Sequence, residues 1–291
     1  MAGSAQSWLP KGGLLVLPGV GWLLIFAVLP AVFLTVLSLW TATVFGIDRT
    51  VTLDSYRTIG SETVYVSIIL KTLRIALATT VLSLLMSYPI AMFLARLEGT
   101  AKSAFLILMF LPFWTSYVVR SFAWLPVLGR NGIINHGLLS LGIIDSPIDW
   151  LLFTEGTVYV GLVYVFTIYM TLPIYLALDG LDRSLIEAAS DLGGRPWQIF
   201  RRVVLPISLP GVWSGCTMVF LLSAGAFVTP QLLGGSSGIM IGNIIAQQFL
   251  STSNWPLGAA LSVFLMATML LAFVLVGRRM GLEQLFLGAR R

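Results

Sequence analysis

The sequence predicts an all-α membrane protein that crosses the bilayer with six helices. Hydrophobic residues make up 57% of the 291 residues and charged residues only 10%. This composition is more apolar than a soluble domain needs. A helix requires about 20 mostly apolar residues to cross the hydrocarbon core. Six segments have that length: Gly13–Trp40, Val66–Ala95, Ser103–Leu128, Thr157–Leu178, Val212–Leu233 and Leu257–Val276.

Lysine and arginine residues are distributed unevenly between the loops. Eleven of the 17 lie on one side of the six spans, and three lie on the other. The remaining three, Lys71, Arg74 and Arg120, lie in or beside spans. Because positively charged loops remain in the cytoplasm, we expect both termini and the loop 184–211 to be cytoplasmic. The net charge of +5 therefore indicates membrane topology and not nucleic-acid binding.

The loop from Ser184 to Gly211 is the longest polar interval between neighbouring spans. Ser184 and Glu187 have the spacing of a capping box, which predicts the start of a short helix. The glycines at 193 and 194 predict its end, and the proline at 196 suits the first turn of a second short helix. The prolines at 206 and 210 are expected to break the chain before the next span. Such a helix-turn-helix predicts a docking surface.

The same loop resembles the EAA loop of bacterial ABC importer permeases. The matching residues are Glu187-Ala188-Ala189, Gly193, Phe200, Leu205-Pro206 and Pro210-Gly211, whereas Gly194 and Arg195-Pro196 depart from the usual pattern. The resemblance implies the type I ABC importer permease fold, in which this loop forms coupling helices that insert into a cleft on the ATP-hydrolysing subunit. It assigns ATPase coupling to Glu187, Ala188, Ala189, Asp191, Leu192, Gly193 and Phe200. The alternative is that Glu187 only caps a helix and the alanines only favour one, and both roles are compatible.

Few groups in the chain are suited to catalysis. Gly234–Gly238 fits a Gly-x-Ser-x-Gly pattern, but the strand, acid and histidine partners of a hydrolase site are missing, since His136 is the only histidine. The sequence also lacks a Gly-x-x-x-x-Gly-Lys-Ser/Thr phosphate-binding loop. We therefore expect a permease subunit and not an enzyme, with no metal and no cofactor of its own, and with ATP and Mg²⁺ used by a partner subunit.

Arg120 is the charged residue placed deepest in a predicted span. Burying it in the bilayer costs about 2.5–3.5 kcal/mol, so its side chain is expected either to face a solute pathway or to extend to the outer surface. Five aromatic residues surround it in the sequence: Phe113, Trp114, Tyr117, Phe122 and Trp124. Such rings form either an interfacial belt or a wall that attracts ammonium groups. The candidate substrate pathway comprises Phe113, Trp114, Tyr117, Arg120 and Trp124.

Several stretches are similar to one branch of this family, the polyamine (spermidine/putrescine) permeases. They include Ser87–Ala91, Pro112–Thr115, Gly161–Tyr164, Ile241–Asn243 and Trp255–Pro256. The resemblance implies an importer in the bacterial inner (plasma) membrane. Its partners would be a second homologous permease, two ATP-binding subunits, an extracytoplasmic solute-binding protein and the lipid bilayer. Residues 66–276 would form the permease core, flanked by residues 1–65 and by the basic tail 277–291.

The identity of the solute is less sharply indicated. No predicted span contains an acidic side chain, and Asp145, Asp149 and Glu155 lie with Arg130 in an outer loop. A polycation would then cross along aromatic faces, backbone carbonyls or acids of the second permease. Opines, phosphonates, thiamine and iron complexes remain alternative solutes for this class. A secondary transporter would need intramembrane acids or a sodium site, and an intramembrane enzyme would need paired polar groups at depth.

Gly211 and Gly215 are four residues apart, which permits close helix contact in a membrane. Packing within the chain is favoured over a contact with a partner.

Overall fold

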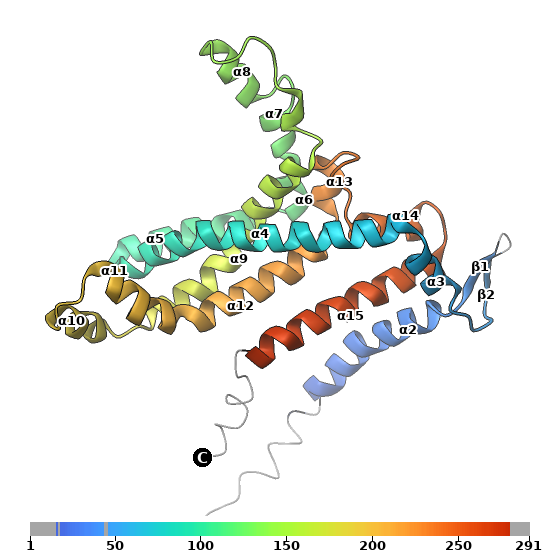
Figure 1. The fold of residues 1–291 in the computed structure, drawn as a ribbon, viewed down its shortest axis with the longest axis horizontal. Coiled ribbons are helices and arrows are strands. Elements are labelled where there is room, and N and C mark those ends of the chain that lie inside the picture. Colours follow the sequence, from blue (N-terminus) through green and yellow to red (C-terminus); the bar gives the residue numbers. More distant parts are fainter. Residues whose placement is uncertain (1–15, 17, 44–45, 280–291) are drawn as a thin grey trace, which may run out of the picture. The chain divides into compact units, whose positions relative to one another are not determined.

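The computed structural model describes residue 16, residues 18–43 and residues 46–279 (Figure 1). The described residues divide into two compact units, and each is considered by itself. One contains the described residues up to Glu62 together with Gln247–Ala267. The other contains Thr63–Ala246 and the described residues from Thr268 onward. The predicted tails, residues 1–12 and most of 277–291, lie outside the described residues.

The first unit begins with a helix over Pro18–Leu37, which contains the π-helical segment η1 (Leu24–Val28) and α2 (Leu29–Leu37). Pro30 lies in the first turn of α2, directly after the wide π turn. A short antiparallel hairpin follows, formed by β1 (Thr41–Thr43) and β2 (Gly46–Asp48). This hairpin corrects the all-helical expectation for the loop after the first span.

Helix α3 (Asp54–Ser61) completes the first part of this unit. The hydroxyl of Tyr56 on α3 hydrogen bonds the Ser38 Oγ at 2.7 Å, which ties α3 to the end of α2. The later part contains the end of α14 (Ile241–Leu250) and the start of α15 (Trp255–Arg279). The rings of Phe249 and Trp255 meet edge to face with centroids 6.1 Å apart.

The second unit is built around three long helices that pack on one another: α4 (Thr63–Arg96), α9 (Glu155–Asp179) and α12 (Leu205–Ala224) (Figure 1). Their shared core is fully buried and consists largely of Ile75, Leu162, Met170, Ile174 and Val219. The spans predicted at 66–95 and 157–178 correspond to α4 and α9 within a few residues.

Two glycines allow α12 to lie close against α9. A Cβ added to Gly211 would lie 2.4 Å from the carbonyl oxygen of Pro173, and one added to Gly215 would lie 2.7 Å from the Met170 sulfur. At Gly211 the near atom belongs to the backbone, so only glycine permits this contact. At Gly215 a Cβ would require the Met170 side chain to shift. The preference for packing within the chain is confirmed.

The predicted third span, 103–128, is not one straight helix. It consists of α5 (Gly99–Phe110), the 3₁₀ turn η2 (Leu111–Trp114), α6 (Tyr117–Phe122) and α7 (Trp124–Leu128). The direction changes by 94° between Gly99–Trp114 and the helices of Tyr117–Ser140. The backbone becomes extended at Thr115, whose hydroxyl donates to the Pro112 carbonyl oxygen at 2.8 Å. This proline-containing turn explains the break.

The remaining elements are short. They are α8 (Ile133–Ser140), the 3₁₀ turn η3 (Asp149–Leu151), α10 (Arg183–Asp191), α11 (Pro196–Ile199), the π-helical segment η4 (Phe200–Val204) and α13 (Val228–Leu233). The predicted fifth span, 212–233, is wrong at its end, because α12 stops at Ala224 and α13 is a separate helix. Among the described residues, five helices are long and apolar enough to span a membrane, or six if the bent pair counts as one span.

Candidate functional site

Helix α10 begins at Arg183, two residues earlier than a Ser184 cap would allow. The Asp182 side chain accepts the N–H of Ser184 at 2.9 Å and caps the helix. The predicted capping box of Ser184 and Glu187 is therefore wrong, because an aspartate, an equally good N-cap, precedes it by two residues. The same hydrogen bond holds the pKa of the Asp182 carboxyl below its usual range. Glu187 is left exposed on the second turn of α10.

Helix α10 ends in a Schellman motif, as the glycine pair predicts. Gly193 has a φ of +78°, a conformation that L side chains rarely adopt. Its N–H donates to the Ser190 carbonyl oxygen at 2.9 Å, and the N–H of Gly194 donates to the Ala189 carbonyl oxygen at 3.0 Å. A Cβ on Gly194 would lie 2.6 Å from that oxygen of Ala189, so this turn requires glycine at both positions.

The second helix of the loop starts at Pro196, as predicted, but it does not end before the next span. Residues Pro196–Ala224 form one helical run through α11, η4 and α12. The expectation that Pro206 and Pro210 break the chain is therefore wrong. Pro206 lies in the first turn of α12, directly after the wide π turn of η4, as Pro30 does after η1. The wider turn accommodates a residue that lacks an N–H donor.

The loop presents large apolar side chains on its surface. Leu192 is 89% exposed, Trp197 69% and Leu185 48%. The predicted coupling residues Glu187, Ala188, Asp191 and Gly193 are exposed beside them. Exposed apolar groups rimmed by polar residues mark protein-interaction sites. Leu185 and Trp197 lie outside the EAA pattern and were not predicted as part of this surface. A tryptophan in a polar loop was a signal for Trp197.

A chain of aromatic contacts connects this surface to the helical bundle. The Trp197 ring stacks on Phe200 with centroids 5.3 Å apart. Phe200 in turn meets Tyr88 of α4 edge to face at 5.7 Å. The Tyr88 hydroxyl hydrogen bonds the Ser208 Oγ of α12 at 2.8 Å. We call these four residues the aromatic relay, since their contacts connect Trp197 to both α4 and α12.

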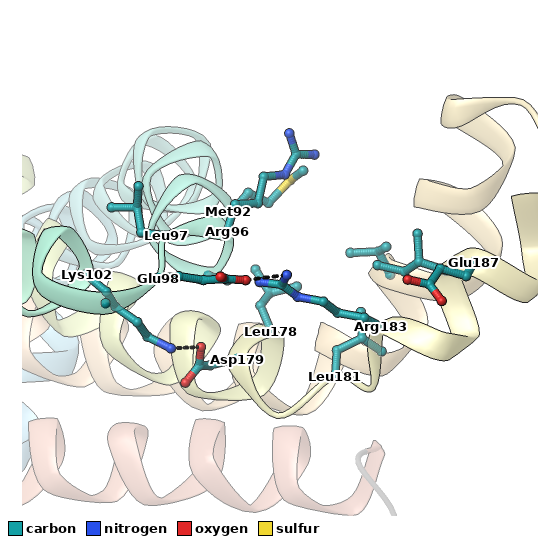
Figure 2. A pocket seen from close by; sticks show the side chains of 14 residues that line it. Met92, Arg96, Leu97, Glu98, Lys102, Leu178, Asp179, Leu181, Arg183 and Glu187 are labelled. Atoms are coloured by element: carbon teal, nitrogen blue, oxygen red, sulfur yellow. Dashed lines mark hydrogen bonds and ion pairs between the residues drawn. The ribbon is translucent and has the colours of Figure 1, made fainter.

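A cavity of about 690 Å³ lies between α10 and the turn that joins α4 to α5. Figure 2 shows two ion pairs on its wall, while Arg96 points away from both. Lys102 Nζ lies 2.5 Å from an Asp179 carboxylate oxygen. Arg183 and Glu98 form the second pair, also at 2.5 Å, with both side chains more than 60% exposed. An exposed pair contributes about 0–1 kcal/mol, so the pair of Arg183 with Glu98 holds the loop weakly. The pair of Lys102 with Asp179 is only partly exposed and joins α5 to the end of α9.

The structure brings together only part of the predicted substrate pathway. Arg120 on α6 is 9% exposed, and its guanidinium carbon lies 5.7 Å from the centre of the Phe113 ring. Its Nε has no hydrogen-bond partner among the described residues. The Tyr117 hydroxyl hydrogen bonds the Thr229 hydroxyl at 2.7 Å. Trp114 is 85% exposed and does not join this buried group. The burial of Arg120 favours a role inside the protein over extension to the surface.

Trp124 faces a different helix from Arg120. Its ring meets Tyr164 of α9 edge to face with centroids 5.4 Å apart.

The acidic residues predicted in the outer loop do not share one partner. Asp149 lies 3.3 Å from Arg130, as the sequence suggested, but Glu155 is the first residue of α9 and pairs with Arg74 of α4.

Known proteins resemble the chain along most of its length. The chain is 38% identical to the spermidine/putrescine transport system permease protein PotB of Escherichia coli over 258 residues, which cover 87% of this chain and 93% of that protein. PotB of Haemophilus influenzae is 35% identical over 270 residues, covering 90% and 94%. The inner membrane ABC transporter permease protein YdcU of Escherichia coli is 36% identical over 220 residues, covering 71% and 70%.

Solved structures share the fold at lower sequence identity. A bacterial ABC transporter that imports alginate superposes with a TM-score of 0.74 at 17% identity, covering 94% of each chain. The MetNI methionine ABC transporter gives 0.56 at 18% identity, covering 73% of this chain and 93% of that one. The family model described as the binding-protein-dependent transport system inner membrane component matches residues 78–281. The chain belongs to this family, and it is a multi-pass inner-membrane permease subunit of an ABC importer, not a catalytic subunit.

Proposed function

We propose that this permease takes up polyamines, spermidine and putrescine among them, delivered by an extracytoplasmic solute-binding protein. The observation that carries the proposal is the 38% identity to a spermidine/putrescine permease along 87% of the chain. The aromatic residues of α6, α7 and α9 support it, because ring faces attract ammonium groups.

The proposed arrangement has six membrane crossings, with the bent pair of α5 and α6–α8 as the third. Both termini and the α10–α11 loop lie in the cytoplasm, which the excess of lysine and arginine on that side supports. Residues 66–276 form the transport core. The assembly contains a second homologous permease and two ATP-binding subunits, and those subunits hydrolyse ATP with Mg²⁺.

Coupling proceeds through the α10–α11 loop. Binding of ATP closes the two ATP-binding subunits, and the cleft that holds the exposed residues Leu185, Leu192 and Trp197 moves with them. The aromatic relay carries that displacement to α4 and α12, which then change their separation and open the solute cavity outward. Glu187, Ala188, Ala189, Asp191, Leu192, Gly193 and Phe200 form the coupling surface in this scheme.

A second solute class has support from a specific observation. Arg120 is buried beside Phe113 with an Nε that lacks a partner among the described residues, and a buried guanidinium suits an anionic group. A relative from Salmonella choleraesuis, whose name assigns it to 2-aminoethylphosphonate transport, is 29% identical over 232 residues. A phosphonate is therefore the alternative solute.

The test is the ATPase activity of the reconstituted complex with its binding protein. The binding protein is loaded in turn with spermidine, with putrescine and with 2-aminoethylphosphonate. Stimulation by the polyamines and not by the phosphonate is the expected result. Stimulation by the phosphonate alone would overturn the polyamine proposal while leaving the importer class intact.

A further inference from the structure

A groove of about 550 Å³ runs along α4 and α9, and its lining is almost entirely apolar and aromatic. Helix α9 contributes Tyr159, Tyr164 and Thr167, α7 contributes Trp124, and α4 contributes Leu82, Leu85 and Met86. The Trp124 and Tyr164 rings meet edge to face at 5.4 Å and form one wall. Both aromatic side chains are at least partly exposed to the groove.

The carboxylate of Glu155 adjoins one end of this groove through the lining residue Tyr159. Glu155 lies one helical turn before Tyr159 on the same face of α9. The Tyr159 hydroxyl donates to Glu155 Oε1 at 2.8 Å, so the carboxylate is fixed to the groove wall. From Glu155 to Thr167 the helix rises by about 18 Å, at about 1.5 Å per residue. The apolar aromatic track thus adjoins, beyond Tyr159, a carboxylate that is paired with Arg74.

The cation that pairs with this carboxylate has a largely exposed side chain. Arg74 Nη2 donates to both Glu155 oxygens at 2.7 Å, yet its side chain is 64% exposed whereas that of Glu155 is 25% exposed. The neighbouring cation Lys71 is directed elsewhere, to the Ser237 carbonyl oxygen at 2.8 Å. An incoming ammonium that replaces the guanidinium would restore the charge-assisted hydrogen bonds of Glu155, and the exposed Arg74 side chain would return to water.

We propose that this groove binds an extended organic polycation, with a terminal ammonium on Glu155 in place of Arg74 and the methylene chain along Tyr159, Trp124 and Tyr164. An acyl chain or an apolar helix would gain nothing from the carboxylate at the end of the track. A polyamine matches both parts, because its ammonium groups alternate with apolar methylene segments. The proposal rests on the proposed polyamine function and identifies the solute contacts on this chain.

The test compares the two partners of one ion pair. Spermidine uptake is measured in proteoliposomes containing the complete importer, as a function of the concentration of spermidine-loaded binding protein. A second series varies the concentration of free spermidine in vesicles whose inner side is accessible. Glu155→Gln removes a charge-assisted hydrogen bond and is expected to raise the half-saturating spermidine concentration at least about tenfold. Arg74→Gln removes the internal competitor and is expected to lower it. A purely structural ion pair predicts that both variants change uptake in the same direction.

A second pair of variants tests the aromatic wall without touching the ion pair. Tyr164→Leu removes the ring and is expected to raise the half-saturating concentration about threefold to thirtyfold, the range of one cation–π contact. Tyr164→Phe keeps the ring and should raise it less. The matched control is the exposed outer pair of Arg130 and Asp149, where Asp149→Asn should leave the half-saturating concentration unchanged.

The outcomes separate the two proposals. Wild-type uptake of spermidine with opposite shifts for Glu155→Gln and Arg74→Gln supports the groove site. If the wild-type importer takes up spermidine but no groove variant changes the half-saturating concentration, the groove site is overturned and the polyamine function stands. The same conclusion follows if Glu155→Gln and Arg74→Gln change that concentration equally. Failure of the wild-type importer to take up spermidine overturns the polyamine function, and the groove proposal with it.

Discussion

Replacement of Gly193 should uncouple ATP hydrolysis from transport while leaving the membrane bundle folded. Gly193 has a φ of +78°, and the space around its missing Cβ is open within 4 Å. A side chain there would therefore meet no neighbouring atom, and its cost would come from backbone conformation alone. For a residue with a Cβ that cost is about 1–2 kcal/mol.

The magnitude follows from how weakly the loop is held. A cost of about 1–2 kcal/mol lowers the population of the native turn about 5- to 30-fold relative to a distorted one. Helix α10 packs on α11 and η4 and is tied to the α4–α5 turn by the exposed ion pair of Arg183 with Glu98, a contact too weak to restore the turn. The bundle of α4, α9 and α12 does not include Gly193 and should remain folded.

The assay is the ratio of solute uptake to ATP hydrolysis in the reconstituted importer. Gly193→Ala and Gly193→Val should lower this ratio, and Gly193→Asn should lower it less, because asparagine tolerates the left-handed conformation. Gly180→Ala is the matched control: Gly180 also follows a helix, but its φ is −78° and an added Cβ finds an ordinary contact at 3.5 Å. A wild-type ratio in Gly193→Val would refute the reasoning.

Three further predictions concern the same machinery. Tyr88→Phe keeps the ring contact with Phe200 but removes the hydrogen bond to Ser208; it should lower uptake per ATP, whereas Tyr88→Leu, which also removes the ring, should lower it further. Gly211→Val should prevent folding of the bundle, seen as loss of the protein from detergent-stable fractions, since even a Cβ would lie 2.4 Å from the Pro173 oxygen. Arg183→Glu should weaken coupling less than about fivefold, as an exposed pair allows, and Glu98→Arg in the same chain should restore it; a double variant no better than the single one would show that the pair has no role.

Much of the fold could be predicted because it depends on local composition. Long apolar segments such as those of α4 and α9 need only sufficient length and hydropathy. The glycine pair that ends α10 was equally readable, since only glycine suits the left-handed position of a Schellman motif. The broken third span was not predicted, because the turn after Pro112 lies within an apolar run that counts as one span by composition.

The prolines near the start of α12 show where predictions from neighbouring residues alone fail. Pro206 and Pro210 predicted a break, yet the helix continues because η4 widens before Pro206 and because Gly211 lets α12 pack on α9. The candidate sites show the same limit. Glu155 was assigned to the outer loop with Arg130, whereas its partners Arg74 and Tyr159 are set by the packing of α4 against α9. Contacts between distant helices carry no signature in one sequence.

The α10–α11 loop has one weak attachment and one well-packed attachment, and the difference bears on the proposed coupling mechanism. Its start is held by the exposed pair of Arg183 with Glu98, which exchanges readily with water. Its end continues without interruption into α12 and is packed through Phe200 on Tyr88. In the proposed coupling scheme, a force on Trp197 would separate α10 from the α4–α5 turn at small cost, while α12 would follow because the helical run from Pro196 to Ala224 has no break. In that scheme the continuous helix at the α12 end of the loop determines the direction of the movement.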